Sequence, residues 1–375
     1  MIRLDQIILR EIRLPLREPF RISSGVVHER RIGLLELYDA SGAVSWSECV
    51  AGEWPNYSSE TIDTAWLAIE AYVTPRVLGV RFDAPGDVHA ALEADFRGHQ
   101  MAKAAVEMGV WGVAATQAGV PLARLIGGVR ERIAVGISLG IQASPKALAD
   151  RASAAIAEGY HKVKIKIEPG RDVEFVRAVR EALPSAELMA DANNAYTLDN
   201  AATLAELDAL NLMMIEQPLA HDDLVRHAEL QRRLRTAICL DESITSLARA
   251  QDMVTLGAGR IINIKPGRVG GFAPSLAIHD YCEQQGIPVW CGGMLESGIG
   301  RAYNVALASL PNFTLPGDVS PSRRYWEQDI VTPEWAMAPD GTMGVPLDRP
   351  GIGVEVDMAR VDALTVRRAV MRVPA

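Results

Sequence analysis

The chain has 375 residues, and its mass of 40.6 kDa predicts either two domains or one large α/β barrel with additions. Its 49% hydrophobic and 23% charged residues are typical of a soluble globular protein and exclude wholesale disorder. Acidic residues outnumber basic ones by 47 to 38, which gives a net charge of −9. Because the chain also has no basic block, we do not expect it to bind nucleic acid or anionic membranes.

The start of the chain and the cysteines point to the cytoplasm. Residues 1–16 mix charged and apolar residues, so neither a signal peptide nor a membrane span is expected. Cys49, Cys239, Cys282 and Cys291 show no paired spacing. They therefore indicate reduced, buried thiols in a cytoplasmic protein, without a disulfide or zinc framework.

The first part of the chain predicts a small α+β domain. Residues 2–16 and 31–38 have the apolar, β-rich pattern of strands, and residues 58–78 and 87–118 have apolar residues at helical spacing. The Gly127-Gly128 pair then marks a boundary, so residues 1–127 are expected to form one domain.

After this boundary, short apolar strands alternate with amphipathic helices. Eight strands are predicted, at 132–139, 162–167, 186–191, 212–216, 237–241, 260–265, 288–292 and 313–318. Their even spacing predicts a (β/α)8 TIM-type barrel over residues 128–320, with an N-terminal α+β capping domain. A doubly wound sheet is the alternative, but no GxGxxG motif follows the first strand. Residues 321–375 are expected to return to the capping domain.

Three acids end successive predicted strands. Asp191, Glu216 and Asp241 follow one another at intervals of 25 residues. One such acid would ordinarily cap the next helix, whereas three that converge need a cation to offset their repulsion. Oxygen ligands without histidine or cysteine favour Mg²⁺, or another divalent cation such as Mn²⁺. Asn193 is expected to add a hydrogen bond around this site.

Lysines occupy the second and sixth predicted strands. Lys164 and Lys166 point to the same face of their strand, and the apolar residues between them need the other face for packing. The lysines are then expected inside the barrel rather than in water at an edge, with pKa values lowered by burial and by each other. Lys265 ends the sixth strand, on the opposite side of the ring. This arrangement suits removal of a proton next to a carboxylate, with the metal stabilising the enediolate.

These motifs carry a resemblance over essentially the whole chain. The segments YHKVKIKIEPGRDVEFVRAVRE, IEQPLAHDDL, ICLDESI, INIKPGRVGG and PVWCGGMLESGIGRA resemble the enolase superfamily and its muconate-lactonizing-enzyme-like subgroup. They are most similar to the branch that contains o-succinylbenzoate synthase and N-succinylamino acid (N-acylamino acid) racemase.

The resemblance implies roles for these residues. It implies that Asp191, Glu216 and Asp241 bind Mg²⁺ and that Lys166 and Lys265 are the acid/base pair. In the dehydration, Lys166 would take the α-proton and return it to the departing hydroxyl, while Lys265 stabilises the enediolate. In the racemization, one lysine removes the proton and the other replaces it on the opposite face.

The resemblance also implies a set of substrate-binding residues. Cap loops at 20–25 and 54–57 would close over the site, and Arg268 matches an arginine typical of racemase-competent members. The full expected set is Lys164, Ser138, Asn193, Arg268, Gly293, Met294, Leu295 and Tyr57.

The implied function is a Mg²⁺-dependent o-succinylbenzoate synthase of menaquinone biosynthesis, with N-acylamino acid racemase activity. Its substrate would be a small carboxylate, and a homo-oligomer is expected. Within the subgroup, the alternatives are a dipeptide epimerase and a muconate cycloisomerase. From other classes, they are a metal-free aldolase that forms a Schiff base on Lys166 and a binding protein that has lost catalysis.

Overall fold

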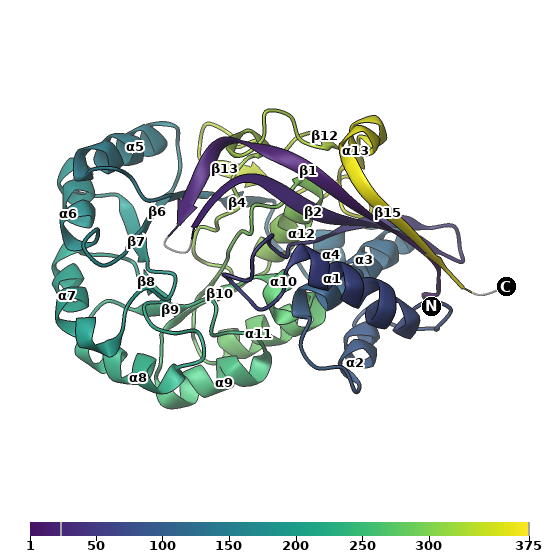
Figure 1. The fold of residues 1–375 in the computed structure, drawn as a ribbon, viewed down its shortest axis with the longest axis horizontal. Helices are drawn as coiled ribbons and strands as arrows, with labels where there is room; N and C mark the ends of the chain where they lie inside the picture. Colours follow the sequence, from purple (N-terminus) through teal and green to yellow (C-terminus); the bar gives the residue numbers. More distant parts are fainter. Residues whose placement is uncertain (23–24, 374–375) are drawn as a thin grey trace.

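A computed structural model describes residues 1–22 and 25–373. Figure 1 shows a ring of strands surrounded by helices, drawn in teal and green, beside a sheet drawn in purple and yellow. The long hairpin of β1 (Leu4–Ile22) and β2 (Gly25–Asp39) reaches from the cap across the open end of the ring. The α+β cap over a barrel is therefore confirmed.

The cap sheet joins both ends of the chain. Its antiparallel strands lie in the order β15-β1-β2-β3, with β3 at Val44–Cys49 and β15 at Thr365–Arg372. Ile7 of β1 lies opposite Met371 of β15. The last strand of the chain thus completes the sheet that the first strand begins.

The predicted helix over 87–118 is two helices. These are α2 (Asp87–Glu93) and α3 (Gln100–Ala118), and His99 between them has a φ of 55°. The other predicted helix begins as α1 (Ile62–Ala68) and continues through the turns Ile69–Val73 and Thr74–Arg76. Most of α3 is buried between the sheet and the barrel, and α4 (Leu122–Leu125) leads into the barrel.

Seven parallel strands form the barrel wall, in the order β11-β10-β9-β8-β7-β6-β5. They are β5 (Gly136–Leu139), β6 (Lys162–Lys166), β7 (Glu187–Asp191), β8 (Ile215–Glu216), β9 (Ile238–Leu240), β10 (Ile261–Ile264) and β11 (Val289–Cys291). Each corresponds to one predicted strand. The consecutive order excludes a doubly wound sheet.

The eighth predicted strand, 313–318, is not a regular strand. Two isolated parallel bridges, from Phe313 to Val289 and from Gly317 to Val135, close the ring between the seventh and first strands. Pro316 lies between them and has no N–H to donate to a ladder, which explains the interruption.

The first predicted strand, 132–139, is divided. Its first part, β4 (Arg132–Ala134), pairs antiparallel with β13 (Thr342–Gly344) outside the barrel, and only β5 belongs to the wall. The sequence pattern alone did not separate β4 from β5, because both segments carry apolar residues.

Helices cover the outside of the ring. They are α5 (Pro145–Ala157), α6 (Val173–Ala182), α7 (Ala201–Glu206), α8 (Leu224–Arg233), α9 (Leu247–Leu256), α11 (Phe272–Gln284) and α12 (Gly298–Ala308), with the short α10 (Pro266–Val269) after β10. The C-terminal segment adds β12 (Val331–Thr332), β14 (Glu355–Val356) and α13 (Met358–Leu364). Across the described part of the chain, no helix has the length and apolar character to cross a membrane.

Two buried cap carboxylates hold barrel helices by their N-termini. Glu107 of α3 accepts hydrogen bonds from the backbone N–H groups of Phe272 (2.7 Å) and Ala273 (2.9 Å), where α11 begins. Glu48 of β3 accepts from the Ser297 hydroxyl (2.6 Å) and the Gly300 N–H (3.0 Å), where α12 begins. These contacts satisfy N–H groups that a helix start leaves free, and they fix the cap over the mouth of the barrel.

Candidate active site

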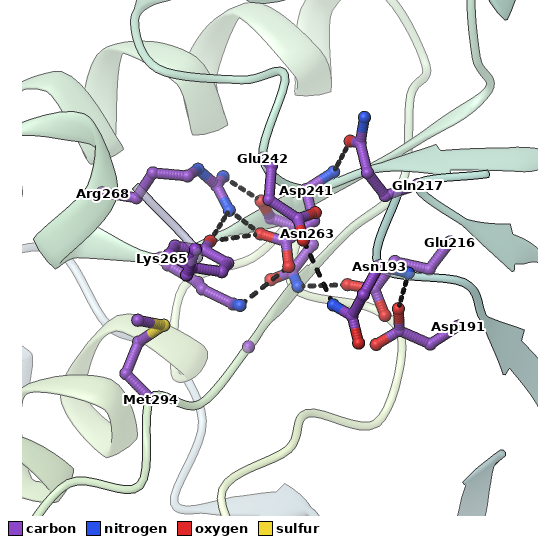
Figure 2. Close-up of polar contacts among 12 residues, drawn as sticks. Asp191, Asn193, Glu216, Gln217, Asp241, Glu242, Asn263, Lys265, Arg268 and Met294 are labelled. Atoms are coloured by element: carbon purple, nitrogen blue, oxygen red, sulfur yellow. Dashed lines mark hydrogen bonds and ion pairs between the residues drawn. The ribbon is translucent and has the colours of Figure 1, made fainter. Parts of the chain in front are cut away.

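The three predicted acids meet at the carboxyl ends of neighbouring strands. Asp191 ends β7, Glu216 ends β8, and Asp241 directly follows β9. Asp191 and Glu216 lie directly opposite each other across the two strands. All three side chains are at most 1% exposed, and Figure 2 shows them turned toward a common region.

Two of the predicted lysines contact this acid cluster from opposite sides. Lys166 Nζ lies 2.5 Å from Asp191 Oδ2 and 2.6 Å from Asn193 Oδ1. Lys265 Nζ lies 2.8 Å from Asp241 Oδ2. Because β6 and β10 are four strands apart in a ring of eight segments, the two ammonium groups approach from opposite walls.

Lys164 is surrounded by carboxylates. Its Nζ lies 2.6 Å from Asp318 Oδ2 and 3.1 Å from both Asp191 Oδ2 and Glu216 Oε2. Burial alone would lower the pKa of Lys164, but these three carboxylates raise it well above its ordinary value. The expected lowering by a neighbouring lysine is therefore wrong for Lys164, because the acids outweigh it.

The same balance of burial and charge acts on Lys265. Burial works to lower its pKa, yet Asp241 and Tyr57 raise the pKa of Lys265 above the usual lysine value. The Lys265 ammonium also lies over the Tyr57 ring, 4.5 Å from its centroid. A glycine makes room for this lysine, since a Cβ at position 292 would stand 2.6 Å from Lys265 Cε.

Arg268 is buried behind Asp241 and is not a solvated helix residue. Its guanidinium donates to Asp241 Oδ1, to the Ile244 carbonyl (2.6 Å) and to the Asn263 carbonyl. Tyr57 donates to the same Asp241 oxygen at 2.8 Å. The short helix α10 turns the chain back after Lys265, which brings Arg268 to the rear of the acid cluster.

A cavity of about 600 Å³ opens between the cap and the lysines. Among the predicted site residues, those that line it are Tyr57, Lys166, Asn193, Lys265, Gly293, Met294 and Leu295. Figure 2 shows Met294 apart from the polar network, on the side of Lys265. Both cap loops contribute, through Phe20, Gly25, Trp54 and Asn56, whereas Ser23 and Ser24 lie outside the described residues.

Three predicted substrate-binding residues lie outside this lining. Lys164 and Arg268 are held within the acid network described above. Ser138 is 5% exposed, its hydroxyl has no hydrogen-bond partner, and its carbonyl accepts from Arg324 at 3.3 Å. A second cavity of about 610 Å³ lies outside the barrel, between α5 and residues 321–327, and none of the predicted site residues lines it.

Several polar residues of the site were not predicted from the sequence. Glu242 accepts from Asn193 at 3.1 Å, and Asn263 donates to Glu216 at 2.6 Å. Asp318 and Lys162 lie deeper in the barrel, 3.3 Å apart. The alternation that placed Lys164 and Lys166 inside also places Lys162 there, so this residue had a signal in the sequence.

The charge and the ligand atoms of the acid cluster indicate what it could bind. Across residues 1–22 and 25–373, no three acidic, histidine or cysteine side chains stand in ligand geometry. Lysine ammonium groups contact each of the three carboxylates. Burial and the charges of Asp191 and Asp241 raise the pKa of Glu216 well above its ordinary value. Three buried carboxylates that need positive charge and offer only oxygen ligands fit a hard divalent cation.

Known protein families and relatives match nearly the whole chain. Residues 5–127 match the mandelate racemase / muconate lactonizing enzyme N-terminal domain, and residues 147–360 match the enolase C-terminal domain-like family. The chain is 46% identical to an o-succinylbenzoate synthase from Geobacillus kaustophilus, covering 97% of this chain and 96% of that one. It is 48% identical to an N-succinylamino acid racemase from Thermus thermophilus, covering 97% and 98%.

A solved structure agrees with these matches. An enolase superfamily member from Listeria innocua superposes with a TM-score of 0.96 at 39% identity, covering 99% of this chain and 100% of that one. Because the two relatives above carry different activity names at similar identity, overall similarity does not decide between the two reactions.

Proposed function

The chain belongs to the mandelate racemase / muconate lactonizing enzyme family of the enolase superfamily, and from this we propose that it is an o-succinylbenzoate synthase that also racemizes N-succinylamino acids. One observation carries the proposal: Lys166 and Lys265 stand on opposite walls of the barrel and open onto one cavity, with three buried carboxylates between them. Proton-transferring groups on opposite faces are what racemization at a carbon next to a carboxylate requires, and dehydration can use one of them as its base.

Asp191, Glu216 and Asp241 would hold a divalent cation, for which we propose Mg²⁺, with Mn²⁺ as a substitute. When bound, the cation supplies positive charge against the negative charge that develops on the substrate carboxylate. The Asn193 N–H donates to Asp191 at 3.1 Å and its side-chain amide donates to Glu242, so Asn193 would keep Asp191 oriented.

The lysines would move the protons. In the dehydration, Lys166 takes the α-proton and gives it to the departing hydroxyl, while the Lys265 ammonium stabilises negative charge on the opposite face. In the racemization, one of the two removes the α-proton and the other delivers a proton to the other face. Lys265 must therefore change its protonation state only in the racemization.

The remaining contacts are proposed to select and position the substrate. Gly293, Met294 and Leu295 line one side of the cavity, and the Met294 N–H donates a hydrogen bond to Glu296 at 2.8 Å. Leu295 has a φ of 57°, a conformation uncommon for a leucine. We propose that Lys164 and Ser138 act from the floor of the site and that Arg268 positions Asp241.

The proposed setting rests on the resemblance of the sequence motifs to this branch of the family. The dehydration would serve menaquinone biosynthesis in the cytoplasm, on a small carboxylate substrate and in a homo-oligomer. We propose residues 1–127 as the cap, 128–320 as the barrel and 321–375 as the segment that returns to the cap.

The deciding experiment is proton NMR in D₂O with Mg²⁺ and one enantiomer of N-succinylphenylalanine, beside an assay of the dehydration. Loss of the α-proton signal with appearance of the other enantiomer supports the racemase activity, and an active dehydration supports the synthase. Dehydration without exchange would mean a dedicated synthase. Silence in both assays would overturn the proposal in favour of a dipeptide epimerase or a muconate cycloisomerase.

One alternative from another class is tested in the same preparation. A metal-free aldolase would form a Schiff base on Lys166, so borohydride with substrate would attach the substrate covalently and EDTA would leave activity intact. We expect the reverse result, with no covalent product and an EDTA-sensitive reaction. A binding protein without catalysis would show neither.

A further inference from the structure

A third lysine lies below the proposed catalytic lysines. Lys162, at the start of β6, points into the barrel like Lys164 and Lys166, and it is fully buried. Its ammonium lies over the Trp290 ring, 3.8 Å from the centroid. Among the described residues its Nζ has no hydrogen-bond partner, and the only carboxylate within ion-pair distance is that of Asp318, at 3.3 Å.

A glycine in the barrel wall leaves space for the Lys162 side chain. On the neighbouring strand β5, a Cβ added at position 136 would stand 2.6 Å from Lys162 Cε. Real Cβ atoms do not approach so closely, so a side chain at position 136 would displace Lys162 from this path. A buried ammonium is costly unless another charge offsets it, which makes its partner informative.

Asp318 is that partner, and it serves two lysines at once. Its Oδ1 faces Lys162 Nζ, while its Oδ2 lies 2.6 Å from Lys164 Nζ. Burial would raise the pKa of Asp318, but Lys162 and Lys164 lower it to about 2, so this carboxylate is ionised. Lys164 in turn contacts the carboxylates of Asp191 and Glu216, at 3.1 Å each.

Lys164 therefore stands between two groups of negative charge. On one side lies Asp318, and on the other lie the Asp191 and Glu216 carboxylates that would hold the cation. A cation at those carboxylates competes with the Lys164 ammonium for the same oxygens. The more firmly Asp318 holds Lys164, the less Lys164 opposes the cation.

We infer that Asp318 and Lys162 are positioning residues that set the affinity of the acid cluster for its divalent cation, acting through Lys164. This inference rests on the proposed function. Lys162, Asp318 and Lys164 form one chain of contacts that ends at the Asp191 and Glu216 carboxylates. Loss of the Asp318 carboxylate makes the surroundings of Lys164 more positive, and loss of the Lys162 ammonium makes them more negative.

The two residues therefore predict effects of opposite sign. Calorimetric titration of metal-free protein with MgCl₂ measures the affinity without any turnover. We expect Asp318→Asn to weaken Mg²⁺ binding roughly 10–100-fold, the range typical of groups that orient metal ligands. Lys162→Met should tighten binding several-fold, because Asp318 then serves Lys164 alone. The double variant should return toward the wild-type affinity.

A matched control separates this effect from loss of a buried lysine as such. Lys103 is also fully buried and forms an ion pair with Glu93 at 2.7 Å, but it lies in α3 of the cap. Lys103→Met should leave the Mg²⁺ affinity unchanged. If Asp318→Asn does not fold, Lys162→Met still decides, because tighter binding does not arise from damaged structure.

The outcomes are distinct. Opposite shifts in the two single variants, with recovery in the double variant, support the inference. Weaker binding in both, or no change in Lys162→Met, overturns it while leaving the proposed metal site intact. Wild-type protein that binds no Mg²⁺ overturns the proposed metal site and the inference with it.

Discussion

Arg268 and Lys265 bind different oxygen atoms of one carboxylate, that of Asp241. The guanidinium takes Oδ1, together with Tyr57, and the ammonium takes Oδ2 at 2.8 Å. Arg268 is itself held by two backbone carbonyls. The orientation of Asp241, and through it the position of Lys265, therefore depends on an arginine that does not line the cavity.

Replacing Arg268 by methionine should harm the racemization more than the dehydration. Racemization needs Lys265 to donate and accept a proton, and this requires accurate placement, whereas dehydration needs only its charge. We expect kcat/KM to fall roughly 10–100-fold for racemization and only a few-fold for dehydration. Arg235→Met, at a side chain that is 83% exposed, controls for loss of charge. Equal losses in the two assays would remove Arg268 as a determinant of the reaction.

The two lysines should separate in an exchange experiment. Lys166→Ala should abolish dehydration and racemization together, because this lysine takes part in both, with losses of at least about 10²-fold. Lys265→Ala should block racemization yet leave α-proton exchange with D₂O for the enantiomer that faces Lys166. Proton NMR on each enantiomer separately measures this. Exchange of both enantiomers in Lys265→Ala would show that the lysines do not serve opposite faces.

The positions of the acids and of the proposed catalytic lysines were predictable because they follow regular rules. Side chains alternate along a strand, and parallel strands of a barrel present their carboxyl ends at one face. Asp191, Glu216 and Asp241 needed only these two rules and their spacing. The closure of the ring was also correct, although one segment contributes bridges in place of a strand.

The remaining contacts depend on backbone that no periodic pattern describes. Asp318 follows Pro316 and Gly317 in the irregular eighth segment. Its position opposite Lys162 and Lys164 therefore could not be derived by counting residues along a strand. Arg268 sits on a four-residue helix that turns back on the site. The pKa direction of Lys164 was wrong for the same reason, since its sign depends on the distance to Asp318.

Removal of the cation should abolish activity and lower stability. Because a divalent cation would offset the repulsion among Asp191, Glu216 and Asp241, its binding favours the folded state. At a concentration 100 times the Kd, the gain is about 2.7 kcal/mol. Thermal unfolding in EDTA and in MgCl₂, with NaCl at matched ionic strength as the control, measures it. Glu216→Gln should lose most of this gain, and a Mg²⁺ effect of wild-type size in that variant would contradict its role as a ligand.

The contact between Glu48 and α12 should make stability depend on pH. Burial, together with the charge of Glu296, raises the pKa of Glu48 to about 8, against 4.5 as its ordinary value. A carboxyl group whose pKa is raised on folding contributes stability below its unfolded pKa, and this contribution is lost as pH rises through the folded value. Wild-type protein must then bury a charge at high pH, whereas Glu48→Gln need not.

We therefore expect Glu48→Gln to gain stability relative to wild type as the pH rises through about 8. The relative gain in the free energy of unfolding between about pH 5 and pH 9 should be about 4 kcal/mol. Urea unfolding of both proteins at several pH values measures it. Glu158→Gln, at an exposed carboxylate, should give a flat difference over the same range. A flat difference for Glu48→Gln as well would mean that Glu48 is ionised at neutral pH, stabilised by the helix N-terminus that it caps.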